Sequence, residues 1–303
     1  MTERMRVDEF LTSLLAICHP LEPFEMPLLD AHGATLAEDV YDGDTLVLKA
    51  GMRIRATQIG LAASIGLDHL PSRPQPRVVV LSAGPDLVQP GNRLEDGQEY
   101  ESNSWLLTTA VREVGAVAYR VHSIPDDEAE LRAVIEDQLV RADLIVISGE
   151  RHDDSFDLIT RTLSSLGDIT TVDLAIESSG YHNFGAIGPD KTPVITLPGD
   201  PISAYISFEL FVRPMIRTML GTPLIHRPSV KAKLEKAITS TSGQRAYIRA
   251  VLSEDGKSVR ALPSQDEQST LSDANAFIAV GENESDLPAG ATVTVVVLER
   301  RYI

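Results

Sequence analysis

The chain has 303 residues and is acidic, with 27 lysines and arginines against 44 aspartates and glutamates and a formal net charge of −17. Nucleic acids and anionic lipids are bound mainly by clustered lysines and arginines, so this charge balance disfavours both as partners. No apolar run reaches the ~18 residues of a membrane-spanning helix, and residues 1–9 lack the apolar core of a secretion signal. We therefore expect a globular cytoplasmic protein of two or three domains, without membrane insertion.

The first third of the chain begins with apolar residues at helical spacing, which predicts an amphipathic helix over residues 6–17. Short strands and turns follow over residues 20–70, with a helix expected at 57–64. This region is too small to hold a large core alone, so other parts of the chain or a partner subunit must cover its apolar face. The proline-rich segment PSRPQP at residues 71–76 predicts a domain boundary.

The middle of the chain alternates apolar strands with helical segments. This alternation predicts an α/β domain over residues 74–222, with a mostly parallel sheet covered by helices on both faces. The expected strands lie at 77–81, 118–122, 144–148, 172–176, 183–187 and 194–197, and the expected helices at 104–114, 127–141, 156–166 and 201–219. Residues 223–303 alternate β-branched residues with turns and predict a small all-β module.

Three short motifs stand out from this pattern. LPGDPIS at residues 197–203 offers a tight turn, Asp200 as a helix cap and Pro201 at the first helical position. SAGPDL at residues 82–87 follows the first buried strand, where ligand sites of open α/β sheets lie. ESNS at residues 101–104 precedes a helix that Ser102, Asn103 or Ser104 could cap.

Together and in this order, the motifs resemble those of the molybdopterin molybdenumtransferase family, which includes the MoeA proteins and the C-terminal domain of gephyrin. SAGPDL is similar to the family's STGDEL, ESNS to DSNS, residues 125–127 to PDD, and LPGDPIS to LPGNPVS. The resemblance implies three domains and a homodimer. The domains would be an elongated dimerisation region over 1–73, a molybdopterin-binding-type α/β domain over 74–222 and a C-terminal β-barrel over 223–303.

The same resemblance implies site residues. Asp86 and Asp157 match positions that would be catalytic if the family activity is kept. Molybdopterin and Mg²⁺ would then be the cofactors. The positions implied for cofactor binding are Asp126, Ser148, Gly149, Pro198, Gly199, Pro201 and Ser203.

Four departures from the family pattern change its charge and length. The family's inserted β-domain is absent after Val40, and its glycine-rich loop reads SGERHDDSFD over residues 148–157. Glu177 begins the segment that corresponds to the family's KPGKP, from which both lysines are gone, and Asp200 replaces an asparagine. Negative charge at these places disfavours a phosphate or molybdate anion.

These departures lead us to expect a non-catalytic dimeric scaffold that binds a peptide tail of a partner. A membrane receptor or a tubulin-like division GTPase could supply the tail, and its groove would involve Tyr247, Phe277, Ile278 and Tyr302. The alternative is the family enzyme, which inserts molybdenum into adenylylated molybdopterin. A third possibility is a divalent metal site formed by His152, Asp153, Asp154, Asp157 and His182.

Overall fold

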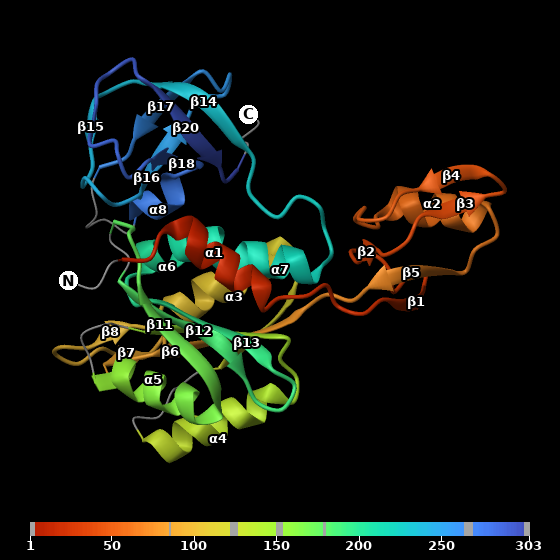
Figure 1. Ribbon diagram of the computed structural model, residues 1–303, viewed down its shortest axis with the longest axis horizontal. Coiled ribbons are helices and arrows are strands. Elements are labelled where there is room, and N and C mark those ends of the chain that lie inside the picture. The colour runs from red at the N-terminus through yellow and green to blue at the C-terminus, as the bar shows by residue number, and fades with distance from the viewer. Residues whose placement is uncertain are drawn as a thin grey trace.

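The computed structural model describes residues 4–84, 86–121, 127–149, 154–177, 180–263 and 269–299. An α/β domain and a β-barrel pack against each other, and an arm extends away from both (Figure 1). The predicted multi-domain α/β architecture with a C-terminal barrel is confirmed. Within the described residues, no helix is long and apolar enough to cross a membrane.

The α/β domain is built on a six-stranded sheet with the order β11-β12-β13-β10-β6-β9. The strands are β6 (Arg77–Ala83), β9 (Val117–Val121), β10 (Leu144–Gly149), β11 (Gly167–Asp173), β12 (Tyr181–Ile187) and β13 (Thr192–Pro198). The pairs from β13 through β10 and β6 to β9 are parallel, as expected. The pairs β11–β12 and β12–β13 are antiparallel, because short connections join each strand directly to the next.

Helices cover both faces of this sheet (Figure 1). One face carries α1 (Val7–Ala16), α3 (Asn103–Val114) and the helix over residues 201–219, and the other carries α4 (Glu128–Leu139) and α5 (Asp154–Leu166). The apolar stripe of α1 is buried there, because the Phe10 ring packs edge-on against the rings of Phe184 and Phe211. The first helix of the chain therefore completes the core of the α/β domain.

The helix expected over residues 201–219 is continuous but not uniform. It consists of α6 (Pro201–Ser207), a π-helical turn η1 (Phe208–Val212) and α7 (Arg213–Met219). The turn contains Glu209, whose buried carboxylate accepts two hydrogen bonds from Arg227 at 2.7 and 2.8 Å. Arg227 also donates to the carbonyl of Leu298 at 2.8 Å, so this network ties the helix to the barrel.

The C-terminal barrel closes through β14-β17-β16-β18-β20. A second tie to the α/β domain lies at Arg245, whose guanidinium donates two hydrogen bonds to Asp8 on α1, at 2.7 and 2.9 Å. The backbone N–H of Arg245 donates to Ala175 at 2.9 Å. The elements here are β14 (Ser229–Leu234), β15 (Ile238–Thr239), β16 (Ala246–Leu252), β17 (Ser258–Ala261), α8 (Ser269–Asp273), β18 (Ala276–Val280), β19 (Asp286–Leu287) and β20 (Thr292–Val297).

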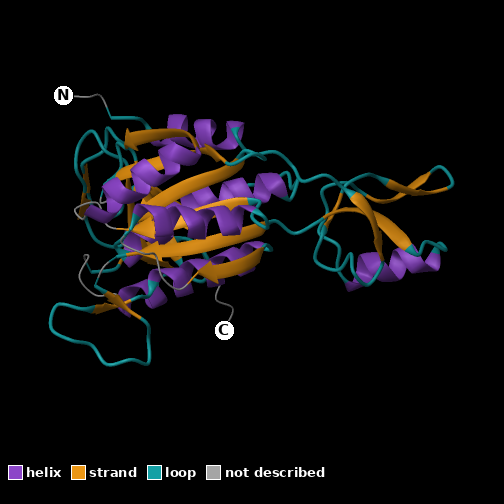
Figure 2. Ribbon diagram, turned by 90° about the horizontal axis from the view of Figure 1, so that it is seen from below, coloured by secondary structure: helices purple, strands orange, loops and turns teal. Residues whose placement is uncertain are grey.

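The arm lies between α1 and β6 in the sequence and joins the body through two adjacent stretches of chain (Figure 2). Its elements are β1 (Phe24–Pro27), β2 (Thr35–Leu36), β3 (Val40–Asp42), β4 (Thr45–Leu48), α2 (Ala56–Ser64) and β5 (His69–Arg73). A small core of its own includes Leu36, Ile54 and Leu70, all almost fully buried. The arm also exposes large apolar side chains, among them Leu29, which is 83% exposed.

Candidate functional site

The candidate site lies at the carboxyl ends of three parallel strands. Ala83 of β6, Gly149 of β10 and Pro198 of β13 stand opposite one another in the strand register. These strand ends lie at one edge of the sheet, and the turns that follow β6 and β13 meet there. This is the edge where open α/β sheets bind ligands.

A cavity of about 360 Å³ opens at this edge. Its wall is built from segments that are far apart in the sequence, including the SAGPDL, ESNS and LPGDPIS motifs and the short strands β7 (Leu87–Val88) and β8 (Glu99–Tyr100). The lining residues are Ser82, Ala83, Gly84, Asp86, Leu87, Gly97, Glu99, Tyr100, Glu101, Ser102, Asn103, Ser148, Gly199, Asp200 and Pro201. The three motifs singled out in the sequence therefore form one site.

Asn103 joins three of these segments. Its side-chain amide donates to Ser148 Oγ at 2.8 Å and to the carbonyl of Gly199 at 2.5 Å. The bonds connect the start of α3 to the end of β10 and to the turn before α6. Asn103 Oδ1 is buried and has no hydrogen-bond partner among the described residues. A buried acceptor of this kind indicates that the wall can accept a donor from a ligand or a water.

Glu101 caps α3, although Ser102, Asn103 and Ser104 are the caps that the sequence suggests. Its buried carboxylate accepts from the Ser104 backbone N–H at 2.7 Å and from the Ser104 hydroxyl at 2.5 Å. The guanidinium of Arg120 lies 3.5 Å away and partly offsets the charge of Glu101. Arg120 also covers the ring of Trp105 at 4.0 Å, which fixes the start of α3 from outside.

Asp200 caps α6 as predicted, because its carboxylate accepts from the Ser203 N–H at 2.8 Å. It also lines a second cavity, of about 600 Å³, between α6 and the barrel. Arg249 on β16 is the buried cation of this second cavity. Burial lowers the pKa of Arg249, while the charge of Asp200 acts in the opposite direction and favours the guanidinium.

Glu177 lies in the wall of the second cavity and is already engaged there. Its carboxylate accepts from the Thr241 hydroxyl at 2.8 Å, and its backbone N–H donates to the carbonyl of Arg245. Glu177 therefore joins the α/β domain to the barrel.

The residues that the resemblance implies for catalysis and cofactor binding do not all line the same cavity. Asp86, Ser148, Gly199 and Pro201 line the first cavity, and Ser203 lines the second. Gly149 and Pro198 are the last residues of their strands beside the first cavity. Asp157 is exposed on α5 and belongs to neither lining, and Asp126 lies outside the described residues.

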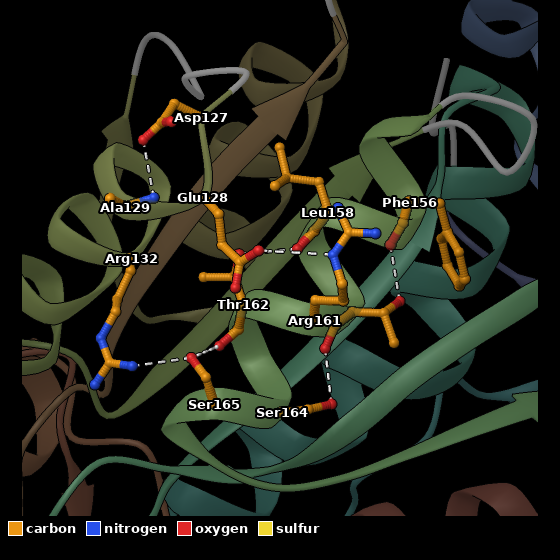
Figure 3. Close-up of polar contacts among 11 residues, drawn as sticks. Asp127, Glu128, Ala129, Arg132, Phe156, Leu158, Arg161, Thr162, Ser164 and Ser165 are labelled. Atoms are coloured by element: carbon orange, nitrogen blue, oxygen red, sulfur yellow. Dashed lines mark hydrogen bonds and ion pairs between the residues drawn. The ribbon is translucent and has the colours of Figure 1, made fainter.

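The helix that carries Asp157 is held against α4 (Figure 3). Glu128 and Arg161 form an ion pair of 3.6 Å, and Arg132 donates to the Ser165 hydroxyl at 3.1 Å. The first helical residue Glu128 follows Asp127, which caps α4 by accepting from two backbone N–H groups. These exposed contacts add to the buried apolar packing between α4 and α5, which positions the helix that carries Asp157.

The expected peptide groove is not an open surface. Phe277 and Ile278 are fully buried, Phe277 against Tyr205 of α6 and Ile278 in the barrel core. Tyr247 lines the second cavity, and Tyr302 lies outside the described residues. The three side chains of this set that the structure describes do not form one exposed docking face.

The possible metal site fails on the position of His182. This histidine packs beside Phe10 and Phe211 on the α1 face of the sheet, whereas Asp157 lies on α5 at the opposite face. His152 and Asp153 lie outside the described residues. Across the described part of the chain, no three His, Cys, Asp or Glu side chains are placed to hold a metal ion.

Sequence reasoning missed the roles of Asn103 and Arg249. Asn103 stands inside the ESNS motif, so its position was available, but its hydrogen-bond partners lie 45 and 96 residues further along the chain. Arg249 has no local motif and reaches the site only because the barrel packs on α6. A sequence pattern could not reveal that contact.

Two family models match the chain. The model described as "Probable molybdopterin binding domain" matches residues 80–218, and the one described as "MoeA C-terminal region (domain IV)" matches residues 231–298. The first match contains the cavity wall, and the second covers the barrel.

Curated relatives and solved structures agree with these matches. Molybdopterin molybdenumtransferase 2 of Mycobacterium tuberculosis is 35% identical over 266 residues, covering 85% of this chain and 65% of the relative. Molybdopterin molybdenumtransferase 1 of that organism is 34% identical, covering 86% of this chain and 63% of the relative. A molybdopterin biosynthesis MoeA protein from Pyrococcus horikoshii has a similar fold, with a TM-score of 0.83 at 20% identity over 98% of this chain and all of that one.

These relatives overturn the expectation of a non-catalytic scaffold with a receptor or division partner. The relatives at 34–35% identity are named as molybdopterin molybdenumtransferases, and the three motifs of this chain line one cavity. Two of the acidic departures have structural partners in the described part of the chain: Asp200 caps α6, and Glu177 joins the α/β domain to the barrel.

Proposed function

Because the chain belongs to the MoeA family, we propose that it acts in molybdenum cofactor biosynthesis as a molybdopterin molybdenumtransferase. The convergence of SAGPDL, ESNS and LPGDPIS on one cavity at the carboxyl ends of β6, β10 and β13 carries the proposal. The chain spans 65% and 63% of the two mycobacterial relatives, so the activity of the whole protein is inferred from this shared part.

Adenylylated molybdopterin and molybdate are the proposed substrates, and the two cavities offer them different chemistry. The first cavity presents carboxylates and an unpaired amide oxygen, whereas the second contains the buried guanidinium of Arg249. An oxyanion is better placed beside Arg249 than among carboxylates. Asp86 is exposed and lines the first cavity.

Mg²⁺ fits this site only together with a substrate. Mg²⁺ is commonly held by one or two carboxylates and by the phosphates of a substrate. Asp86 and Asp200 are two carboxylates of the first cavity, and the described residues supply no group of three. We propose that Mg²⁺, where it takes part, arrives with the substrate.

Complementation tests the proposed activity. The chain is expressed in a bacterial strain that lacks its molybdopterin molybdenumtransferase, and the activity of a molybdenum-dependent nitrate reductase is measured. We expect rescue by the natural sequence and its loss with Asp86→Ala or Asp157→Ala. The control Asp255→Ala, in an exposed loop of the barrel, should rescue fully. No rescue by soluble, folded protein would refute the proposal.

We also propose that the protein is a homodimer held together by its arm. Among the described residues, seven of the thirteen exposed large hydrophobic side chains lie in the arm. They are Phe24, Leu29, Tyr41, Leu46, Met52, Leu61 and Leu67. Concentrated exposed apolar surface marks an interaction site.

A further inference from the structure

The first cavity has an unusual charge for a site that handles a phosphorylated substrate. Every charged side chain that the described residues contribute to its lining is a carboxylate, namely Asp86, Glu99, Glu101 or Asp200. Carboxylates repel phosphate and oxyanions, but they accept hydrogen bonds from N–H groups. The cavity therefore favours the part of a ligand that donates hydrogen bonds over the part that carries negative charge.

Asn103 adds a directed acceptor to this wall. The residue is only 6% exposed, and its amino group already donates to Ser148 and to the carbonyl of Gly199. Rotating the amide by half a turn would place its oxygen against the Gly199 carbonyl, so these bonds fix the orientation of the side chain. Asn103 Oδ1 then remains as a buried acceptor without a donor. A ligand N–H that reaches it recovers the free energy lost by leaving this acceptor unpaired.

Tyr100 supplies an aromatic surface in the same wall. Its side chain is 48% exposed, and its hydroxyl donates to the carbonyl of Asn92 at 3.0 Å. This bond anchors the far end of the ring, and the residue contributes to the cavity lining. Aromatic rings of this kind pack well against planar heterocycles.

We propose that Asn103 is a specificity-determining residue that accepts a hydrogen bond from the exocyclic amine of an aminopyrimidinone ring. The ring of the substrate packs beside Tyr100, and the phosphate-bearing part stays outside the first cavity, toward Arg249. The inference rests on the proposed function, because that function supplies a substrate that contains such a ring.

Two small ring compounds that differ at the amine test how much this group contributes to binding. Pterin carries a 2-amino group, and lumazine has the same bicyclic ring with an oxygen in its place. Equilibrium dialysis of the purified full chain at slightly acidic pH, with both rings neutral, gives the two dissociation constants. We expect pterin to bind about 10-fold or more tightly than lumazine, as for one hydrogen bond to a buried acceptor. Inorganic phosphate should not compete with pterin.

The variant Asn103→Ala tests whether the Asn103 side chain causes the preference for pterin over lumazine. We expect the variant to bind pterin about 10- to 100-fold more weakly and lumazine nearly as before, so that the preference disappears. The matched control is Asn275→Ala in the barrel, where a buried amide bonds both backbone groups of Leu252. This control should lower the melting temperature and leave the pterin preference intact.

Several outcomes would overturn the inference. They are equal binding of pterin and lumazine by the natural sequence, a preference that survives in Asn103→Ala, competition by phosphate, and no pterin binding at millimolar concentration. Circular dichroism shows whether Asn103→Ala is folded, and Tyr100→Leu provides a second variant that should weaken both rings alike. The dialysis does not require turnover, so pterin selectivity without complementation would refute only the proposed activity. Complementation without selectivity would refute only the role of Asn103.

Discussion

His182 is a buried imidazole that its surroundings keep neutral. It is fully buried beside the rings of Phe10 and Phe211, and its Nδ1 lies 2.7 Å from the carbonyl of Thr196. A carbonyl only accepts, so Nδ1 carries the proton of the neutral ring. Burial lowers the pKa of His182 to about 4, and the hydrogen bond to Thr196 offsets only part of this effect.

This depressed pKa predicts a loss of stability in mild acid. The unfolded chain protonates this histidine near pH ~6.5, whereas the folded chain protonates it only near pH 4. Between these values the unfolded state binds more protons, so the contribution of His182 is complete above pH ~6.5 and declines as the pH falls. The total loss is about 3 kcal/mol of unfolding free energy, from the size of the pKa difference.

Urea unfolding at a series of pH values between 7.5 and 4 checks this expectation. His182→Asn keeps an N–H donor for Thr196 and removes the titrating group, so its stability should depend less on pH over this window. The comparison variant is His32→Asn on the exposed surface of the arm. Identical pH dependence in natural protein and His182→Asn would contradict the assignment.

At the level of single residues, the sequence predicted what depends on neighbours along the chain. Asp200 was expected to cap α6 and does so, because a cap needs only the backbone three residues ahead. The role of Asn103 could not be predicted, since its acceptors come from β10 and from the turn after β13. Glu101 was missed because three better capping residue types follow it directly.

Two glycines show how the elements differ in their tolerance of a side chain. Gly60 lies in the interior of α2 on an exposed face, and a Cβ there would meet nothing within 4 Å. Gly185 of β12 pairs closely with β11, and a Cβ there would collide with the backbone carbonyl of Asp168.

Opposite effects on stability follow for the two alanine substitutions. Gly60→Ala should raise the unfolding free energy by about 0.5–1 kcal/mol, because glycine loses more conformational freedom in a helix. Gly185→Ala should lower it by about 1–3 kcal/mol, because β11 must move away from β12. Differential scanning calorimetry of both variants and the natural protein gives the signs. Equal shifts in the same direction would contradict the packing described.

The helix over residues 201–219 was predicted as an element, but its internal irregularity was not. A helix over these residues was predicted from the sequence, with Pro201 at its first position. The π-helical turn at Phe208–Val212 was not predicted. It contains Glu209, whose partner Arg227 comes from the connection to the barrel, so the deviation accompanies a contact between domains.

The exposed arm makes the assembly of the whole molecule testable. Sedimentation velocity should show a dimer of the natural chain. The double variant Phe24→Glu with Leu29→Glu should shift it to the monomer, because charges at the contact would be desolvated. Val140→Glu is the matched control, since Val140 is 86% exposed on the α/β domain, away from the arm. A monomeric natural chain, or a dimer unaffected by the double variant, would refute assembly through the arm.

At the scale of the whole chain, alternation of strands and helices predicted the α/β fold, and β-branched alternation predicted the barrel. Neither pattern could show how the barrel is placed. Its position depends on two ion pairs. Arg245 pairs with Asp8, which lies 237 residues earlier in the chain. Arg227, in the connection to the barrel, pairs with Glu209 of the preceding helix. The second cavity exists only through this placement, so it could not be predicted.

The burial of α1 against late parts of the sequence has a consequence for synthesis. Phe10 is synthesised before its partners Phe184 and Phe211, which follow 174 and 201 residues later in the chain. The arm, with contacts confined mostly to residues 24–73, can fold during this interval. The apolar stripe of α1 must wait as an uncovered segment of the nascent chain, where it is a binding site for chaperones and a starting point for aggregation. Docking of α1 is therefore a late step in the maturation of the α/β domain.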